Sequence, residues 1–562
     1  MKIILNLLLF FFLLFVSNNS KAGLGDSEMG AGGWKRNIEV NEIEEIDNED
    51  KEESFQDDNK FKVIELNKID ANTVGTLTES EGGLSYDMWS GSDINIIRDY
   101  LENLPINKES DLAIELINKI LLTSAELPGK KNKEMEFILI RINKLIELGD
   151  FDNAKLLIEA VSNNDNEKIL IKEIEINLSL NNFDLVCTGV EDKRKQFNEN
   201  LFWRKTEIFC QILNGETNKA NLSLSLLKEE QDFNDEDFLK IIDSLIYKED
   251  INHENFDNLN LLNLAMTRVA NINIKENYVL KDDPLLLSMI YRMPNVPIKI
   301  RIEAIEKSKK LLNLPIATVE EIYNSYDLEE KDKKISIDEN ILLGYETQAI
   351  LFQMAISEEN EEKKEKIIKK SLELGSINGN FSLISELNLN SILDIKPSKK
   401  LFWFANSAIK SLLIKNKIEE ALDWYEIIKK ERNKDSETFK EFIELWPIIE
   451  FFNLKNKNTQ NKNISQNELL KLIDDFKSDN QDVKFNTLGF YLLEIFGIEI
   501  NPNFWLINLD NQDMETKIMP NTSLISLLKN SSKSKKVGET ILLILMSLDG
   551  KNFNQLHPFF LQ

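Results

Sequence analysis

The stretch Leu148-Gly149-Asp150-Phe151 recurs in altered form as Leu180-Asn181-Asn182-Phe183 and as Leu213-Asn214-Gly215-Glu216. The three stretches start 32 and 33 residues apart. Gly or Asn recurs in each, because the residue after a helix often adopts the left-handed conformation, which these two residues tolerate best. The repetition predicts three turns of one kind, each joining two helices.

Apolar residues on both sides of these turns follow a helical period. Before the first turn, Ile138, Ile142 and Leu145 recur at intervals of four and three residues, which is one stripe of a helix. A compact residue follows the start of each turn by six or seven positions, where two antiparallel helices must approach closely: Ala154, Val186 or Cys187, and Ala220. A two-helix unit of about 33 residues is typical of tetratricopeptide (TPR) repeats, and one such unit cannot bury its stripe alone. We therefore expect an all-α, TPR-like helical-hairpin solenoid, an α-superhelix.

Three later segments repeat the pattern of paired helices, over residues 297–326, 344–375 and 401–429. Pro397, in the segment 390–398, is expected to mark a joint between two helical lobes. We expect an N-terminal solenoid lobe over residues 92–395 and a C-terminal helical lobe over residues 396–562. The segment 498–522 is the least helical in pattern and is expected to be a loop or an insertion.

The first residues have the order of a secretory signal peptide. Lys2 precedes the uncharged run Ile3 to Val16, and Ser20-Lys21-Ala22 places small residues before an expected cleavage between Ala22 and Gly23. The run has 14 residues, whereas a membrane-spanning helix needs about 20. We expect residues 1–22 to be removed on export to the periplasm. Because no cysteine lies near the cleavage site and no later run is long enough to span a bilayer, the mature chain is expected to be soluble, with no stable membrane anchor.

An acidic leader is expected after the signal, over residues 23–60. Between Glu39 and Asp58 there are eleven acidic residues and a single lysine, so this segment buries too little apolar surface to fold and is predicted to be disordered. Residues 61–91 are expected to form a short extended and capping segment. Within it Tyr86, Met88 and Trp89 are predicted to pack onto the first helices as a cap, with a binding loop as the alternative.

The two cysteines of the chain are Cys187 and Cys210. The turn between their helices is expected near Asn198, 11 and 12 residues from the two cysteines, so an antiparallel pair of helices places the two thiols level. The periplasm supports disulfide bonds. We therefore predict a Cys187–Cys210 disulfide, with a pair of reduced core thiols as the alternative.

The chemistry-bearing motifs of the common enzyme classes are missing. His253 and His557 are the two histidines, and neither belongs to a metal-binding pattern. The chain has no GxSxG, P-loop or GxGxxG motif, and its net charge of −28 argues against nucleic acid as a ligand. We expect no cofactor, no metal, no catalytic residue and no enzymatic activity.

Several short stretches resemble an uncharacterised family of exported alphaproteobacterial proteins with tetratricopeptide-like helices: residues 82–84, 88–91, 120–125, 209–216, 301–306 and 537–540, together with Cys187. Some members of that family are labelled antifreeze polyproteins. The resemblance implies the fold and the compartment alone, because ice binding calls for a flat, regular surface rich in Thr or Ala, which the sequence does not indicate.

These observations favour a periplasmic scaffold or adaptor that binds a protein or peptide partner in a groove of the solenoid. One alternative is an envelope enzyme of the peptidoglycan lytic transglycosylase type, whose lysozyme-like domain motifs the C-terminal region lacks. The other alternative is an outer-membrane assembly factor, which the sequence does not distinguish from a scaffold.

Overall fold

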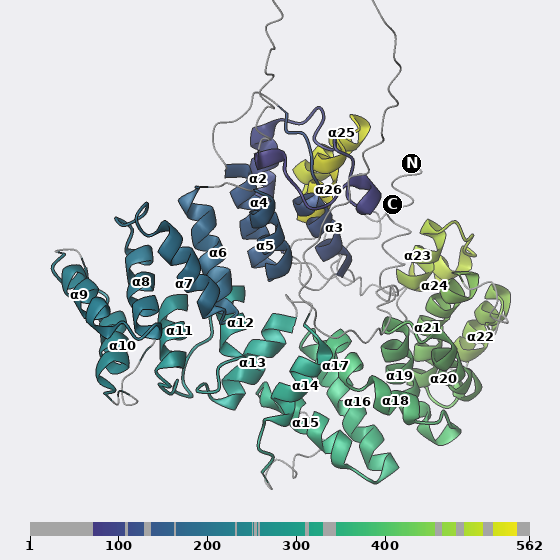
Figure 1. The fold of residues 1–562 in the computed structure, drawn as a ribbon. Coiled ribbons are helices and arrows are strands. Elements are labelled where there is room, and N and C mark those ends of the chain that lie inside the picture. Colours follow the sequence, from purple (N-terminus) through teal and green to yellow (C-terminus); the bar gives the residue numbers. More distant parts are fainter. Residues whose placement is uncertain are drawn as a thin grey trace, which may run out of the picture. The chain divides into compact units, whose positions relative to one another are not determined.

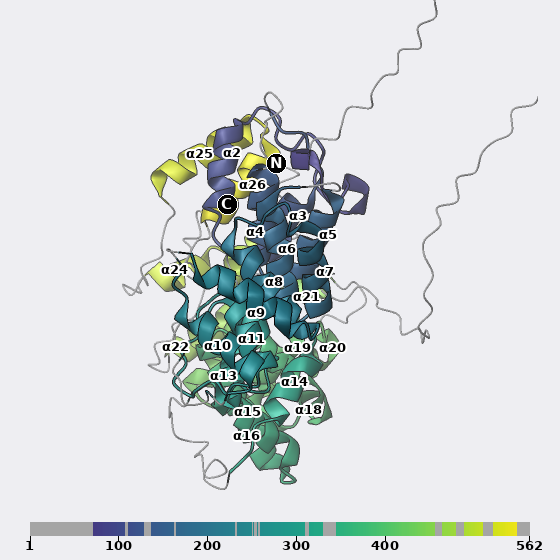
Figure 2. The same cartoon turned by 60° about the vertical axis from the view of Figure 1, so that its left-hand side comes forward.

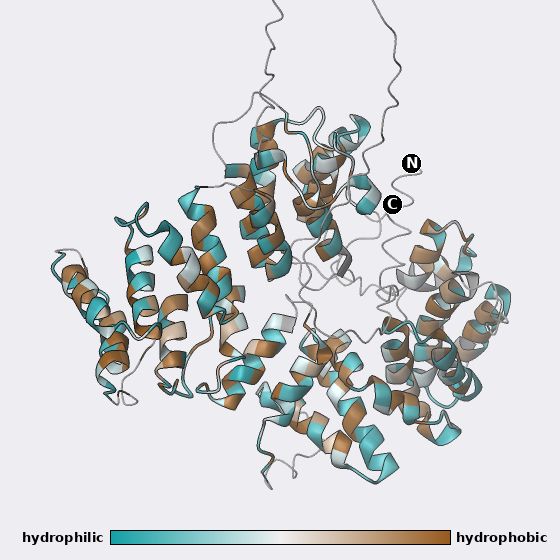
Figure 3. Cartoon of the chain, in the orientation of Figure 1, coloured by the Kyte–Doolittle hydropathy of each residue, from teal (hydrophilic) through white to brown (hydrophobic). Residues whose placement is uncertain are grey.

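The computed structural model describes residues 71–106, 111–128, 136–161, 165–230, 233–249, 251, 256, 259–309, 314–329, 344–455, 463–478, 488–509 and 521–547. The described chain is α-helical and contains no β-strand, apart from a single β-bridge between Leu77 and Thr123. Most helices have one apolar and one polar side (Figure 3). The prediction of an all-α protein is confirmed.

The helices follow one another along the chain in Figure 1. The first group is α2 (Ile94–Glu102), α3 (Asp111–Leu122), α4 (Glu136–Glu147), α5 (Phe151–Ala160), α6 (Glu167–Ser179), α7 (Phe183–Lys193), α8 (Leu201–Leu213) and α9 (Thr217–Lys228). The second group is α10 (Glu236–Tyr247), α11 (Leu261–Val269), α12 (Pro284–Ile290), α13 (Ile298–Lys309), α14 (Ile316–Asn324), α15 (Glu346–Ser357), α16 (Glu361–Ile377), α17 (Phe381–Leu387) and α18 (Leu389–Asp394). The third group is α19 (Phe402–Ile414), α20 (Ile418–Glu431), α21 (Ser436–Lys455), α22 (Gln466–Ser478), α23 (Leu488–Ile495), α24 (Asn503–Leu509), α25 (Thr522–Lys533) and α26 (Val537–Ser547). Short 3₁₀ helices lie at η1 (Ala71–Thr73), η2 (Glu79–Glu81) and η4 (Lys399–Leu401).

One turn geometry joins six helix pairs: α4–α5, α6–α7, α8–α9, α16–α17, α19–α20 and α25–α26. In each pair the residue two positions after the end of the first helix has a left-handed backbone conformation, and the second helix starts two positions after that residue. The six left-handed residues are Gly149, Asn181, Gly215, Gly379, Asn416 and Lys535. The N–H of the next residue donates to the carbonyl oxygen five positions earlier over 2.7–3.1 Å, as in Asp150 to Leu145. This is the Schellman motif, which satisfies carbonyl groups at the end of a helix. The three turns predicted from the sequence are present.

The second helix of each hairpin approaches the first closely. Five positions after the left-handed residue the side chain is fully buried at Ala154, Val186, Ala220 and Ala421. Small or compact side chains there let the two helix axes come together, while the flanking apolar residues fill the core.

Helices α11 and α12 run back over earlier helices and do not extend the series of hairpins. Both contact α6, and α12 also contacts α4. Figure 1 shows α12 beside α6, and Figure 2 shows α6 and α11 in the same stack of helices. The first helices of the α4–α5 and α6–α7 hairpins are therefore covered by the chain itself on one side.

Packing is continuous across the predicted boundary between residues 395 and 396. Helix α19 contacts α16 and α17, and the Ser385 hydroxyl donates to the Ser411 hydroxyl oxygen over 3.1 Å. In addition, α26, which we assigned to the C-terminal lobe, contacts α2 and α3. The last hairpin therefore packs on the first helices of the chain.

Smaller differences concern helix ends. The sequence favours Ser92 as the N-cap of the first helix, but α2 is capped by Asp93, whose carboxylate accepts from the Asn95 N–H over 2.8 Å. The segment 498–522, expected to be a loop, contains α24. Within the expected extended segment 61–91, the described part holds η1, η2 and the Leu77–Thr123 bridge. The signal peptide, the acidic leader and residues 61–70 lie outside the described residues.

Among the described helices, none combines the length and the apolar character that crossing a membrane requires.

Candidate functional site

The residues predicted to form a cap divide into two buried side chains and one exposed one. Met88 and Trp89 are almost fully buried, and the Trp89 ring meets Phe137 edge to face at 6.4 Å between centroids. The backbone N–H of Gly538 in α26 donates to the Met88 carbonyl over 2.9 Å. Tyr86 remains 55% exposed. Met88 and Trp89 thus join the first helices to the last hairpin, and Tyr86 is the part of this loop that a partner could touch.

Cys187 of α7 and Cys210 of α8 lie at disulfide distance, with 2.09 Å between the sulfur atoms and 5.4 Å between the Cα atoms. The pair connects the second helix of one hairpin to the first helix of the next. Cys210 is buried and Cys187 is half-buried. The residues expected at signal cleavage, Ala22 and Gly23, lie outside the described residues, as do His253 and His557.

A buried arginine that the sequence analysis missed holds the capping segment in place. Arg141 of α4 is 2% exposed and donates to the carbonyl oxygens of Leu121 and Val74, each over 2.6 Å. Burial lowers its pKa to about 9. The sequence carries a signal for this role, because Arg141 interrupts the apolar stripe between Ile138 and Leu145.

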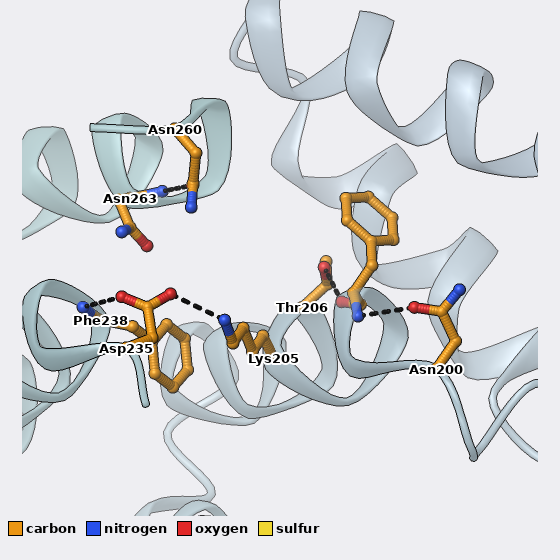
Figure 4. Close-up of polar contacts among 8 residues, drawn as sticks. Asn200, Lys205, Thr206, Asp235, Phe238, Asn260 and Asn263 are labelled. Carbon is orange, nitrogen blue, oxygen red and sulfur yellow. Dashed lines mark hydrogen bonds and ion pairs between the residues drawn. The ribbon is translucent and has the colours of Figure 1, made fainter. Parts of the chain in front are cut away.

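An ion pair between α8 and α10 combines charge with aromatic contacts. The Lys205 ammonium donates to Asp235 over 2.7 Å and lies 5.2 and 5.4 Å from the ring centroids of Phe233 and Phe238. Figure 4 shows that Asp235 also accepts from the Phe238 N–H over 3.0 Å, so the same carboxylate caps α10.

Two asparagines act as the corresponding caps beside this ion pair. Asn200 accepts from the Phe202 N–H over 2.9 Å at the start of α8, and Asn260 accepts from the Asn263 N–H over 2.8 Å at the start of α11 (Figure 4). Thr206 Oγ1 donates to the Phe202 carbonyl within α8 over 2.7 Å, and the other contacts drawn there cap a helix or link two helices. The arrangement is that of a structural junction.

A second buried polar network joins α13, α14 and the start of α17. The Tyr323 hydroxyl donates to Glu306 over 2.7 Å, and the Asn380 amide donates to the other carboxylate oxygen over 3.1 Å. Burial, followed by the charge of Glu306, raises the pKa of Tyr323 well above its ordinary value. The phenol therefore stays protonated and keeps donating at neutral pH.

The described His, Cys, Asp and Glu residues form no group of three that could hold a metal ion. Comparison of the chain with protein-family models, with curated proteins and with solved structures finds no match. Function must therefore be argued from the surface and the packing of this chain.

Proposed function

We propose that the chain is a TPR-like helical-hairpin solenoid that serves as a periplasmic scaffold and binds a protein or peptide partner. The six copies of one Schellman turn support the repeat architecture, because each joins two consecutive helices through a turn of the same length and hydrogen bonding. The export pattern at the N-terminus and the cysteine pair at disulfide distance support the compartment.

The observation that carries partner binding is a set of exposed leucines on successive second helices. Leu156 of α5 is 50% exposed, Leu185 of α7 is 53% exposed and Leu222 of α9 is 64% exposed. Leu156 and Leu222 stand seven positions after their left-handed residues, Gly149 and Gly215, and so occupy the same place in their hairpins. Exposed apolar side chains at repeated positions offer contacts that a partner surface can bury.

Because of how α11 and α12 pack, we do not place the partner site on α4 and α6, the first helices of their hairpins. Since α11 and α12 contact α6, and α12 contacts α4, the chain itself uses a face that a partner would otherwise occupy. We expect the second helices, and not a groove along α4 and α6, to receive the partner.

Site-specific photo-crosslinking tests the proposal in cells. A photoreactive amino acid at Leu156 or Leu222 should trap a defined envelope protein, while the same amino acid at Glu419, an exposed position on α20, should not. Equal labelling at all three positions would count against a specific face.

Two further measurements separate the alternatives. Alkaline phosphatase fused after residue 60 should be active outside the cytoplasm, and an inactive fusion would remove the periplasmic part of the proposal. Clearing of purified cell wall in a zymogram by the isolated protein would replace the scaffold with an envelope enzyme.

A further inference from the structure

Three arginines from consecutive helices converge on the turn between α12 and α13. Arg268 lies near the end of α11, Arg292 follows α12, and Arg301 lies in the first turn of α13. Arg268 Nη1 donates to the Arg292 carbonyl over 2.7 Å, and Arg301 Nε donates to the Tyr291 carbonyl over 3.1 Å. The guanidinium groups of Arg268 and Arg301 are thus held on neighbouring carbonyl oxygens.

The third arginine lies against the same turn. The guanidinium carbon of Arg292 stands 4.3 Å from the centroid of the Tyr291 ring, and its Nη1 donates to the Ser288 carbonyl and hydroxyl oxygens. All three side chains are half-buried, so each keeps some contact with solvent.

No carboxylate of the described residues forms an ion pair with any of these three arginines. Burial lowers the pKa of each, and the charge of Arg268 further lowers the pKa of Arg292 and of Arg301. Glu321 acts in the opposite direction on Arg301. A concentration of like charge is unusual in a chain whose net charge is −28, because acidic residues are abundant enough to pair with it.

The arginines contact carbonyl groups at the C-terminal end of α12, and this capping explains part of the arrangement. It leaves most of their positive charge uncompensated. The C-terminus of a helix carries about half a negative charge, against three guanidinium groups. Each guanidinium has five N–H donors, and the carbonyl contacts use one donor of Arg268 and one of Arg301. Among the described residues, neither Nη group of Arg301 has an acceptor, so both are left for a ligand. Paired donors of this kind match the two oxygens of a carboxylate or phosphate group.

We propose that Arg268, Arg292 and Arg301 form a binding site for an oxyanion that carries at least two negative charges. The shared chemistry is a multivalent phosphate or carboxylate, and pyrophosphate and citrate are the probes that distinguish the two. The site is separate from the leucines of α5, α7 and α9, and it stands whether or not those leucines bind a partner.

Calorimetric titration of the full mature chain, at constant ionic strength in a chloride buffer, tests the site. One or both probes should bind the wild-type chain at a single site. The double variant Arg268→Gln/Arg301→Gln, in which an amide can still donate to the carbonyl oxygens, should bind at least about tenfold more weakly, because each charged hydrogen bond contributes about that factor or more. Arg204→Gln, which removes a surface ion pair with Glu230, should bind as the wild type does.

A second measurement uses the wild-type chain, so its outcome does not depend on whether the double variant folds. Phenylglyoxal modifies accessible arginines, and the bound probe should slow modification at Arg268 and Arg301 while leaving Arg98 and Arg204 unchanged, as read by peptide mass spectrometry. Equal affinity of the wild type and the double variant, or equal protection at all four arginines, would overturn the site. Absence of binding by both probes at millimolar concentration would overturn it as well.

Discussion

Gly538 of α26 packs against the indole ring of Trp89, so that a Cβ atom at position 538 would stand 2.5 Å from Trp89 Cζ3. The same glycine donates its backbone N–H to Met88. The contact joins the last described helix to the loop before α2. Glycine is needed here for close approach, and the contact explains why the Met88–Trp89 loop is buried.

Gly538→Ala should destabilise the protein by about 1–3 kcal/mol, because the added methyl group overlaps a buried ring that has no room to move. The measurement is the free energy of unfolding from urea denaturation. Val537→Ala, at the exposed neighbouring position, is the matched control and should change this free energy by less than about 0.5 kcal/mol. Equal effects of the two substitutions would mean that α26 does not rest on Trp89.

Removal of the cysteine pair by Cys187→Ser/Cys210→Ser should cost roughly 3 kcal/mol of stability under oxidising conditions, because the bridge restricts the unfolded chain. The variant and the reduced wild type should then unfold at similar urea concentrations. Recovery of two alkylatable thiols from native, non-reduced protein would show that the bridge does not form.

The shared turn geometry predicts opposite effects of exchanging glycine and lysine. Gly215 and Lys535 occupy the same left-handed position, with φ of 74° and 58°. Gly215→Lys should destabilise by about 1–2 kcal/mol, since a Cβ atom is disfavoured in that conformation, and Lys535→Gly should stabilise by about 0.5–1 kcal/mol. Thermal melts of the two variants check the pair, and a shift of both in the same direction would contradict the assignment of one turn type.

Arg141→Gln should cost at least about 2 kcal/mol, because the buried carbonyl groups of Leu121 and Val74 lose a charged donor. Arg98→Gln removes a surface ion pair with Glu136 and should cost less than about 1 kcal/mol. Urea denaturation of both variants gives the comparison. A small loss for Arg141→Gln would show that the capping segment is held by apolar packing alone.

The contribution of two buried tyrosines to stability should fall as the pH rises above about 10. The pKa values of Tyr323 and Tyr425 are raised well above that of a free phenol, chiefly by burial. Above pH 10 the unfolded chain therefore releases protons that the folded chain retains, and each such group lowers the free energy of unfolding by up to about 1.4 kcal/mol per pH unit.

Relative to the wild type, Tyr323→Phe should remove the contribution of Tyr323 to this decline, because the pKa of Tyr323 is one of several tyrosine pKa values that burial raises. At neutral pH the same variant should be less stable by about 1.5–3 kcal/mol, because Glu306 loses a hydrogen-bond donor. Tyr247→Phe, at an exposed position, serves as the control and should leave both quantities unchanged. An identical pH dependence for Tyr323→Phe and the wild type would contradict the protonated state of Tyr323 in the fold.

Local patterns made much of the helical structure predictable. The Gly and Asn residues near positions 149, 181 and 215 mark real left-handed turns. The turn of the last hairpin has Lys535 at this position in place of Gly or Asn, so the sequence pattern does not predict it. The sequence favours Ser92 as the cap of α2, one residue before the actual cap Asp93, because both are good capping residues and the sequence alone does not choose between them.

The candidate site residues were less predictable. The Cys187–Cys210 pair could be anticipated because both cysteines belong to one antiparallel helix pair and a count along the chain places them level. The convergence of Arg268, Arg292 and Arg301 could not, since it depends on how α11, α12 and α13 turn relative to one another.

The helical class, the turns that contain Gly or Asn and the level of the two cysteines can be read from the sequence, because each depends on residues close together along the chain. The cover of α6 by α11 and α12, the contact of α26 with Trp89 and the burial of Arg141 among backbone carbonyls emerge only in the folded chain. These contacts join segments distant in sequence. Their geometry depends on which apolar helix faces pack together without voids. A helical period in the sequence shows that a helix has an apolar face, but it does not show which other helix packs against that face.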